Sequence, residues 1–379
     1  DIYLKYDFVV YPGADVNAIN IEYTGVDGLL VEGGNLVIHT SVTDINELKP
    51  VAYQEINGAR KNINCNYIVR GNTVGFEITD GYDKNIPLVI DPVIVASTFS
   101  GTTEDTWGHC ATYDDAGNIY TGGRNFGTGY PVTTGAFQTY FAGGVDIAIS
   151  KYNPSGSSLF FGTFIGGSNE DIAQSMFVNS NYQLYIYGST NSNNYPVTSG
   201  CFDNSFNGNT DIFVTKLNAA GSALLGSTYV GGSNLSGRNT MVFNYGDDFR
   251  GEIIADANDN AYISSFTYAS NFPVTAGAYD QSYNGGQDAV VFKMNSNLSS
   301  MIWSTYLGGS QDDAAYSLRV DSNGEVYVVG GTNSSNFPTT AGVLNQNYMG
   351  GTSTGYVNIA GDGFITRLSA TGSSLTAST

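Results

Sequence analysis

The sequence predicts an all-β protein in which one non-repeating domain precedes an array of four-stranded repeats. The composition suits short strands joined by tight turns, because glycine contributes 48 of 379 residues, tyrosine 27 and phenylalanine 20, whereas charged residues make up only 13%. No stretch sustains the 3.6-residue apolar period of an amphipathic helix. The segment at residues 270–295 occurs four times in recognisable form, which is typical of a modular β array.

Residues 1–92 do not repeat, and we predict that they form a small β-sandwich. Apolar residues alternate with polar ones, as at Ile19, Ile21 and Tyr23, which indicates strands with one buried face. Glycine-rich pairs at residues 33–34 and 71–72 are expected to form hairpin turns. A proline-bounded segment ends this domain, and the repeat region is expected to cover residues 93–379.

Three independent landmarks give the period of the repeat region. A threonine in a Ser/Gly-Thr motif, a proline and an aspartate each return at intervals of 65 to 77 residues. The landmarks are Thr98, Thr163, Thr228, Thr305 and Thr379; Pro131, Pro196, Pro273 and Pro338; and Asp146, Asp211, Asp288 and Asp362. We therefore expect four units at about residues 98–162, 163–227, 228–304 and 305–379.

Each unit contains four strand-like segments, exemplified by residues 315–321, 325–332, 288–295 and 299–309. The first two segments are joined by Asp-Ser-Asn-Gly or a similar turn-forming sequence. Apolar residues fill consecutive positions of the third segment, as expected for a sheet that is covered on both faces. Four antiparallel strands in each repeat predict the blades of a β-propeller.

The repeat also resembles a known family. The segments STYLGGS, NGEVYVVGGTNSSNFPTTAG and GGxDxxxxK are similar to SBBP repeats, the seven-bladed β-propeller repeats of bacterial secreted and surface proteins. Residues 1–92, which end in PLVIDP, are similar to the β-rich domain that often precedes such repeats. The resemblance implies a propeller fold and an extracellular or cell-surface location in a bacterium, and it implies little about activity.

We expect the four blades to be part of a larger propeller. A strand-like segment, VIVASTFSG, precedes the first blade, and a further copy of the motif begins at Ser373. Closure of a four-bladed ring, the alternative, would not need this additional strand. Since the chain starts at Asp1 and stops within a motif, we also expect it to be an internal or processed piece of a longer protein.

The charge of the chain argues against one class of partner. The formal net charge is −20 at pH 7, and nucleic-acid binding requires clustered lysine and arginine. We interpret the acidity as a source of solubility. No run of 18 apolar residues is present, so membrane insertion is not expected either.

Two insertions break the repeat and mark the candidate binding site. The third unit carries 12 additional residues between Gly232 and Tyr262, and the fourth carries 9 between Pro338 and Asp362. We expect the first in the connection that enters a blade and the second between the second and third strands, on the same face of the propeller. Together they would form a raised rim that contains Arg238, Tyr245, Asp247, Asp248, Arg250, Tyr356 and Asn358.

Aromatic and planar polar side chains of this kind suit stacking on a sugar or holding a protein loop. In the alternative interpretation the insertions only lengthen a blade edge or contact the N-terminal domain, because loops tolerate insertion at little cost in free energy.

A recurrent aspartate is the second candidate. Asp146 and its three equivalents are each followed five residues later by a basic residue, as in Asp288 and Lys293. The four carboxylates could form an arc that attracts a cation. Because the aspartate returns in every unit, we favour a structural role in capping the turn before its strand.

No metal site or cofactor is predicted. The Asp-rich turns at residues 114–118, 256–260 and 321–325 lack the terminal glutamate of a calcium loop. Asp312-Asp313 and Asp247-Asp248 are the pairs that a calcium ion would use, but calcium binding is not predicted. The two histidines, His39 and His109, have no neighbouring ligand in the sequence.

We expect the protein not to be an enzyme, and no catalytic residue is predicted. The chain has no G-x-S-x-G, H-E-x-x-H or P-loop motif. His109 matches Gln174 of the next repeat, so we interpret it as a repeat position and not as a catalytic base.

The function that we expect is that of an extracellular scaffold or adhesion module, which binds a protein or glycan at the bacterial cell surface. The alternatives are a polysaccharide-active enzyme with carboxylates at the propeller mouth and an architectural subunit that contacts other chains in a secreted assembly or filament.

Overall fold

The computed structural model describes residues 8–39, 44–56, 58–91, 100–239, 241, 250–350 and 361–379. Contacts between Cα atoms divide the chain into two compact units, Asp1–Ala96 and Ser97–Thr379. The boundary expected between residues 92 and 93 lies outside the described residues. Within these ranges, no helix has the length and apolar character needed to cross a bilayer.

The first unit is a β-sandwich. Its elements are β1 (Phe8–Val10), η1 (Val16–Ala18), β2 (Ile21–Glu22), β3 (Gly28–Glu32), β4 (Asn35–His39), β5 (Asp44–Glu47), β6 (Val51–Ile56), β7 (Ala59–Arg70), β8 (Thr73–Ile78) and β9 (Leu88–Asp91). A six-stranded sheet has the order β1-β9-β6-β7-β8-β2, and β3, β4 and β5 form a second sheet. Both predicted hairpin turns are confirmed, because Glu32 pairs with Asn35 and Arg70 pairs with Thr73.

The core of the sandwich lies between its two sheets. Leu36 and Ile38 of β4 are buried in one cluster with Cys65 and Tyr67 of β7. Alternate residues of these strands point into the cluster, which is the period-2 pattern that the sequence shows. The β-sandwich prediction is therefore confirmed.

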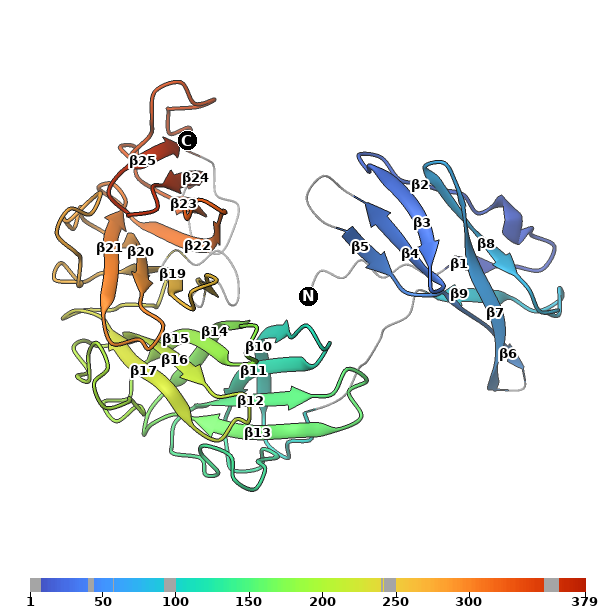
Figure 1. Cartoon of the computed structure of the whole chain (residues 1–379), viewed down its shortest axis with the longest axis horizontal. Coiled ribbons are helices and arrows are strands. Elements are labelled where there is room, and N and C mark those ends of the chain that lie inside the picture. Colours follow the sequence, from blue (N-terminus) through green and yellow to red (C-terminus); the bar gives the residue numbers. More distant parts are fainter. Residues whose placement is uncertain are drawn as a thin grey trace. The chain divides into compact units, whose positions relative to one another are not determined.

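The second unit consists of four sheets of four strands, the blades of a β-propeller (Figure 1). Blade 1 contains β10 (Thr106–Tyr113), β11 (Ile119–Asn125), β12 (Asp146–Tyr152) and β13 (Leu159–Ile165); blade 2 contains β14 (Asp171–Val178), β15 (Leu184–Thr190), β16 (Asp211–Leu217) and β17 (Leu224–Val230). Blade 3 contains β18 (Glu252–Ala255), β19 (Ala261–Thr267), β20 (Asp288–Met294) and β21 (Met301–Leu307); blade 4 contains β22 (Asp313–Val320), β23 (Val326–Thr332), β24 (Asp362–Leu368) and β25 (Leu375–Ser378).

Every pair of neighbouring strands in a blade is antiparallel and consecutive in sequence. The Thr landmarks from Thr163 onward lie in or directly after the fourth strand of a blade, as Thr163 does in β13. A unit that starts at a landmark therefore combines the last strand of one blade with the first three strands of the next.

Apolar cores join consecutive blades. One cluster contains Ile149 of blade 1 and Ile186 of blade 2, another contains Tyr187 of blade 2 and Phe292 of blade 3, and a third contains residues of blades 3 and 4. Figure 1 shows the resulting arc of blades, with the first strands β10, β14 and β22 on its inner side. The consecutive apolar residues of the middle strands are explained by these neighbours on both faces.

One expectation is corrected by the strand pairing. The segment that begins at Ser373 is not a surplus strand, because β25 pairs with β24 and completes blade 4. That expectation also rested on the leading segment VIVASTFSG, residues 93–101. All but the last two residues of this segment lie outside the described residues.

Candidate functional site

The innermost strands of blades 1, 2 and 4 each carry a β-bulge. The pairing of β10 with β11 skips His109, that of β14 with β15 skips Gln174, and that of β22 with β23 skips Tyr316. A bulge adds one residue to a strand and redirects a side chain, and bulges are common beside active sites. The bulges thus present one side chain per blade at equivalent positions of the inner strands.

The insertion of blade 3 precedes β18 and begins directly after the position that corresponds to the bulge residues of the other blades. Ser236 forms a bridge with Thr267, just as Asp171 pairs with Thr190, whereas Glu252 pairs with Ser264. Asn239 therefore occupies the bulge position, and the added residues 240–251 follow it. β17 ends at Val230 and β18 begins at Glu252, so the added residues lie in the connection that enters blade 3, as expected, and strand pairing resumes after them without a change of register.

The start of the inserted segment is anchored in the core between blades 3 and 4. Met241 is 1% exposed and packs against Phe266, Ala314 and the partly buried Tyr316. The Asn239 side chain also bonds the backbone of Met241, with the Met241 amide donating to Oδ1 at 3.0 Å. The insertion thus begins from a fixed point on the innermost strand.

Arg238, a predicted rim residue, forms part of an ion-pair cluster that spans three blades. Its Nη1 lies 3.4 Å from Oε2 of Glu170, and Arg124 Nη1 lies 3.9 Å from Oε1 of the same carboxylate. The side-chain amide of Gln174, which follows Glu170 closely in sequence, donates to the carbonyl of Gly237 at 2.7 Å. Arg238 therefore helps to hold blades 1, 2 and 3 together at the base of the insertion.

Arg250 is the other predicted rim residue that the structure describes. Its guanidinium lies 5.8 Å from the ring centroid of Tyr316, the bulge residue of blade 4. Arg238 and Arg250 thus flank the two ends of the insertion. Tyr245, Asp247, Asp248, Tyr356 and Asn358 lie outside the described residues.

His109 is a bulge residue, in agreement with its interpretation as a repeat position. Burial, with a contribution from Arg124, lowers its pKa to about 4. The imidazole is therefore neutral at physiological pH. What the sequence does not show is that Asn239 corresponds to His109, Gln174 and Tyr316, because the third repeat is interrupted directly after Asn239.

The recurrent aspartates cap backbone groups, as the structural interpretation predicts. Oδ2 of Asp146, Asp211 and Asp288 accepts the amide of the residue four positions earlier, at 2.6 to 2.7 Å. Their Oδ1 atoms are buried and have no hydrogen-bond partner. Burial is the main cause that raises the pKa of Asp146 and Asp211 to about 7 and that of Asp288 to about 8.

The basic residue of each repeat pairs with the turn between the first two strands of a blade. Lys151 lies 3.2 Å from Asp114, and Lys293 lies 3.1 Å from Asp256. Each ammonium also lies over the tyrosine ring of the second strand, at 4.7 Å from the centroid in blade 1. Lys151 is buried and Lys293 is partly buried, and both ammonium groups have the carboxylate and aromatic partners that a charge removed from water requires.

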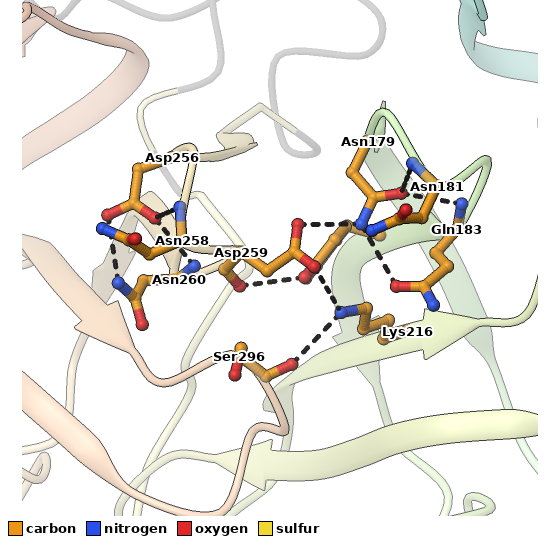
Figure 2. Close-up of polar contacts among 10 residues, drawn as sticks. Asn179, Asn181, Gln183, Lys216, Asp256, Asn258, Asp259, Asn260 and Ser296 are labelled. Carbon is orange, nitrogen blue, oxygen red and sulfur yellow. Dashed lines mark hydrogen bonds and ion pairs between the residues drawn. The ribbon is translucent and has the colours of Figure 1, made fainter.

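Blade 2 departs from this pattern. Asn179 stands where the other blades have an aspartate, and Lys216 instead reaches Asp259 of blade 3 at 3.5 Å (Figure 2). Asp259 Oδ1 accepts the Asn179 amide at 2.8 Å, and the carbonyl of Ser296 accepts a bond from Lys216 at 3.3 Å. This cluster therefore links blades 2 and 3 at the end opposite to the insertions.

A pocket of about 500 Å³ lies beside this cluster. It is lined by residues of the first turns of blades 1, 2 and 3, including Tyr113, Asp115 and Asp256. Tyr113 is 75% exposed, and three of the four aspartates that line the pocket pair with lysines. No predicted site residue lines it.

The turns that resemble calcium loops are side-chain-bonded hairpin turns. Asp114 Oδ1 accepts the amides of Ala116 and Asn118, and Asp256 does the same for Asn258 and Asn260. Among the residues described, no group of three or more His, Cys, Asp or Glu side chains is arranged to hold a metal ion.

Residues 302–338 match the beta-propeller repeat named SBBP, and residues 1–93 match a domain of unknown function, DUF7948. No curated protein matches the chain.

Three of the similar solved structures illustrate how distant these likenesses are. Hydrazine synthase of Kuenenia stuttgartiensis is 8% identical, with 83% of this chain and 76% of that chain covered and a TM-score of 0.30. An ulvan lyase of polysaccharide lyase family PL25 is 9% identical, with coverages of 95% and 74% and a TM-score of 0.35.

A prolyl endopeptidase is 12% identical, with coverages of 93% and 49% and a TM-score of 0.27. Such scores give no information about function. The resemblance of the repeat to SBBP repeats, predicted from the sequence, is confirmed by the match of residues 302–338 to that family model, and residues 1–93 match the DUF7948 model.

Proposed function

We propose that this protein is a non-enzymatic, extracellular β-propeller scaffold that binds a protein or glycan at the surface of a bacterium. The propeller supplies a rigid frame, and the insertion of blade 3 supplies the contact surface. Binding residues are commonly placed on loops that a rigid scaffold positions.

The observation that supports this proposal is the origin of the insertion. The segment begins after Asn239, which corresponds to the bulge residues of the other inner strands, Met241 anchors its start, and Arg238 and Arg250 lie at its two ends. An insertion that only lengthened a blade edge would not need a buried anchor. Its sequence, with Tyr245, Asp247 and Asp248, offers aromatic and polar groups for recognition.

The test is a loop replacement. Residues 242–249 are exchanged for a Gly/Ser segment of equal length, which leaves Met241 and the strand pairing unchanged. We expect thermal unfolding within a few degrees of the parent chain and a loss of at least tenfold in binding to bacterial surface glycans or envelope proteins, measured on a glycan array and by pull-down.

A second variant with residues 351–360 exchanged in the same way separates the two insertions. Undiminished binding by both variants, with the fold intact by circular dichroism, would rule out the insertions as the binding site. A matched control outside the insertions is Tyr113→Ser, at the opposite end of the blades, which should bind like the parent chain.

One observation favours the alternative of a polysaccharide-active enzyme. Asp114, Asp115, Asp256 and Asp259 line the same pocket of about 500 Å³. Glycoside hydrolysis uses two carboxyl groups on either side of the scissile bond. Incubation with polysaccharides and detection of new reducing ends is the test: turnover that Asp115→Asn abolishes would replace the scaffold proposal.

A further inference from the structure

In blade 2 a buried lysine lies beside a carboxamide, where blades 1 and 3 have a carboxylate. The turn between the first two strands begins with a residue whose side chain accepts backbone amides of the turn, and this residue is Asp114 in blade 1, Asn179 in blade 2 and Asp256 in blade 3. Lys216 and Asn179 are only 5% and 8% exposed. A lysine amine is a nucleophile that can attack a carboxamide, whereas it does not attack an ionised carboxylate.

Blades 1 and 3 show that a lysine in this register reaches the first residue of the turn. Nζ of Lys151 lies 3.2 Å from Oδ2 of Asp114, and Nζ of Lys293 lies 3.1 Å from Oδ2 of Asp256. In all three blades Oδ1 accepts two amides of the turn, so Nδ2 of Asn179 takes the place of these Oδ2 atoms. Rotation about the side-chain bonds of the blade 2 lysine therefore brings its amine to the carboxamide at about 3 to 3.5 Å, the separation that a reaction between two positioned groups needs.

The turn also supplies hydrogen-bond donors for the oxygen of this carboxamide. The backbone amides of Asn181 and Gln183 donate to Oδ1 of Asn179 at 3.0 and 2.9 Å. Attack of an amine on the carboxamide carbon places negative charge on this oxygen, and backbone donors that are already in position stabilise such a charge. The same two bonds hold the carboxamide in place, with its Nδ2 directed at Asp259.

Asp259 of blade 3 contacts both of the groups that would react (Figure 2). Its Oδ1 accepts a hydrogen bond from Nδ2 of Asn179 at 2.8 Å, and its Oδ2 lies 3.5 Å from Nζ of Lys216. The carbonyl of Ser296 accepts a further bond from Nζ at 3.3 Å, which holds the amine at this carboxylate. Nζ also lies 4.7 Å from the ring centroid of Tyr185, and burial lowers the pKa of the lysine, which favours the neutral, nucleophilic amine. One carboxylate is thus placed to move protons between the nucleophile and the leaving group.

We propose that Lys216 and Asn179 form an intramolecular isopeptide bond in the folded chain, with Asp259 as the group that transfers the protons. Asp259 takes a proton from the ammonium group of Lys216, and the neutral Nζ attacks Cγ of Asn179. Asp259 gives this proton to Nδ2 and takes another from Nζ. The Cγ–Nδ2 bond then breaks, and the ammonia that leaves accepts the remaining proton and departs as ammonium. The new Nζ–Cγ amide replaces the carboxamide of Asn179, and no oxidant, reductant or cofactor is consumed.

Mass spectrometry of the whole chain, denatured after it has folded, tests the proposal. The chain should be lighter than its sequence by the mass of one ammonia molecule. Trypsin should not cleave after Lys216, and further digestion with chymotrypsin should give a branched peptide that contains both Asn179 and Lys216. A chain with the full mass of its sequence, or a loss of ammonia that maps to another asparagine, would overturn the proposal.

Three variants test the roles of the individual groups, with circular dichroism to show that each is folded. Lys216→Arg removes the amine, and Asp259→Asn keeps the left-handed turn but cannot transfer protons, so both should keep the full mass of their sequences. The matched control, Asp256→Asn, places a carboxamide beside Lys293, but blade 4 has Gly324 at the position of Asp259. This control should lose one ammonia molecule and not two. Crosslinking of Asp259→Asn to the same extent as the parent chain would contradict the assigned proton transfer.

Discussion

Individual aspartates set the pH dependence of this fold. The Oδ1 atoms of Asp146, Asp211 and Asp288 are buried without a hydrogen-bond donor, so the ionised form is unfavourable in the folded chain. Asp288 is the most affected, with a pKa of about 8, because burial acts together with the neighbouring Asp313. A neutral side chain of the same shape would remove this cost.

We expect Asp288→Asn to stabilise the protein above pH 8 and to flatten its stability profile. The folded pKa lies above the unfolded value of about 4, so the folded chain binds the additional proton between these values and stability falls as pH rises from about 4 to about 8. The gain above pH 8 should be on the order of 1 to 3 kcal/mol. Urea unfolding at pH 4, 6 and 8.5 measures it.

The control is Asp211→Asn, since Ser236 stands where blade 4 has Asp313. Asp211→Asn should also stabilise the protein. The gain in stability should reach its full size about one pH unit lower than for Asp288→Asn, in line with a pKa of about 7 for Asp211. Equal stability of wild type and Asp288→Asn at every pH would show that the carboxyl is not destabilised in the fold.

At the level of the structural elements, the turn between the first two strands of blade 3 is connected to blade 2 through the buried Lys216. Lys216 is 5% exposed and burial lowers its pKa, whereas Asp259 opposes this change. Asp259 has a positive φ of 63°, a left-handed conformation that asparagine also adopts. The charge can therefore be removed without strain in the turn.

Asp259→Asn should destabilise the propeller by about 1 to 3 kcal/mol, because it leaves a buried ammonium without its carboxylate. Asn179→Asp should restore most of the loss, since it supplies the in-blade aspartate that Lys151 and Lys293 have as partners. Chemical denaturation of the two single variants and the double variant measures this coupling. Additive effects of the two changes would contradict the assignment.

At the level of the whole molecule, each blade–blade interface depends on the next blade in the arc. Ile149 and Ile365 occupy equivalent positions and have the same side chain, but the first is fully buried and the second is 57% exposed. Mutations at the two positions therefore separate the stability that the following blade contributes from the stability that the strand itself contributes.

Ile149→Ala should cost about 2 to 5 kcal/mol, and Ile365→Ala less than about 1 kcal/mol. Thermal and urea unfolding followed by tryptophan fluorescence measure both variants. A comparable loss at the two positions would mean that the outer face of blade 4 is already covered by another part of the chain.

The array of blades could be predicted from the sequence because strand period, turns and landmarks recur together. The exact point of the blade 3 insertion could not, since a count of residues does not reveal that strand pairing resumes at Glu252 or that Asn239 corresponds to the bulge residues of the other blades. The contact of Lys216 with Asp259 also depends on the packing of one blade on another. A hint of it is the asparagine at position 179, the one turn that breaks the aspartate pattern.

The bulge on the inner strand makes the propeller a natural display scaffold. Twelve residues are inserted between Asn239 and Glu252, and the strand pairing keeps its register before and after them. The length of this loop can therefore change without a change in the blade that carries it. Foreign peptides grafted after Gln174 or Tyr316 should be presented in the same manner. Diversified libraries at these positions would yield binders in which several loops share one stable frame.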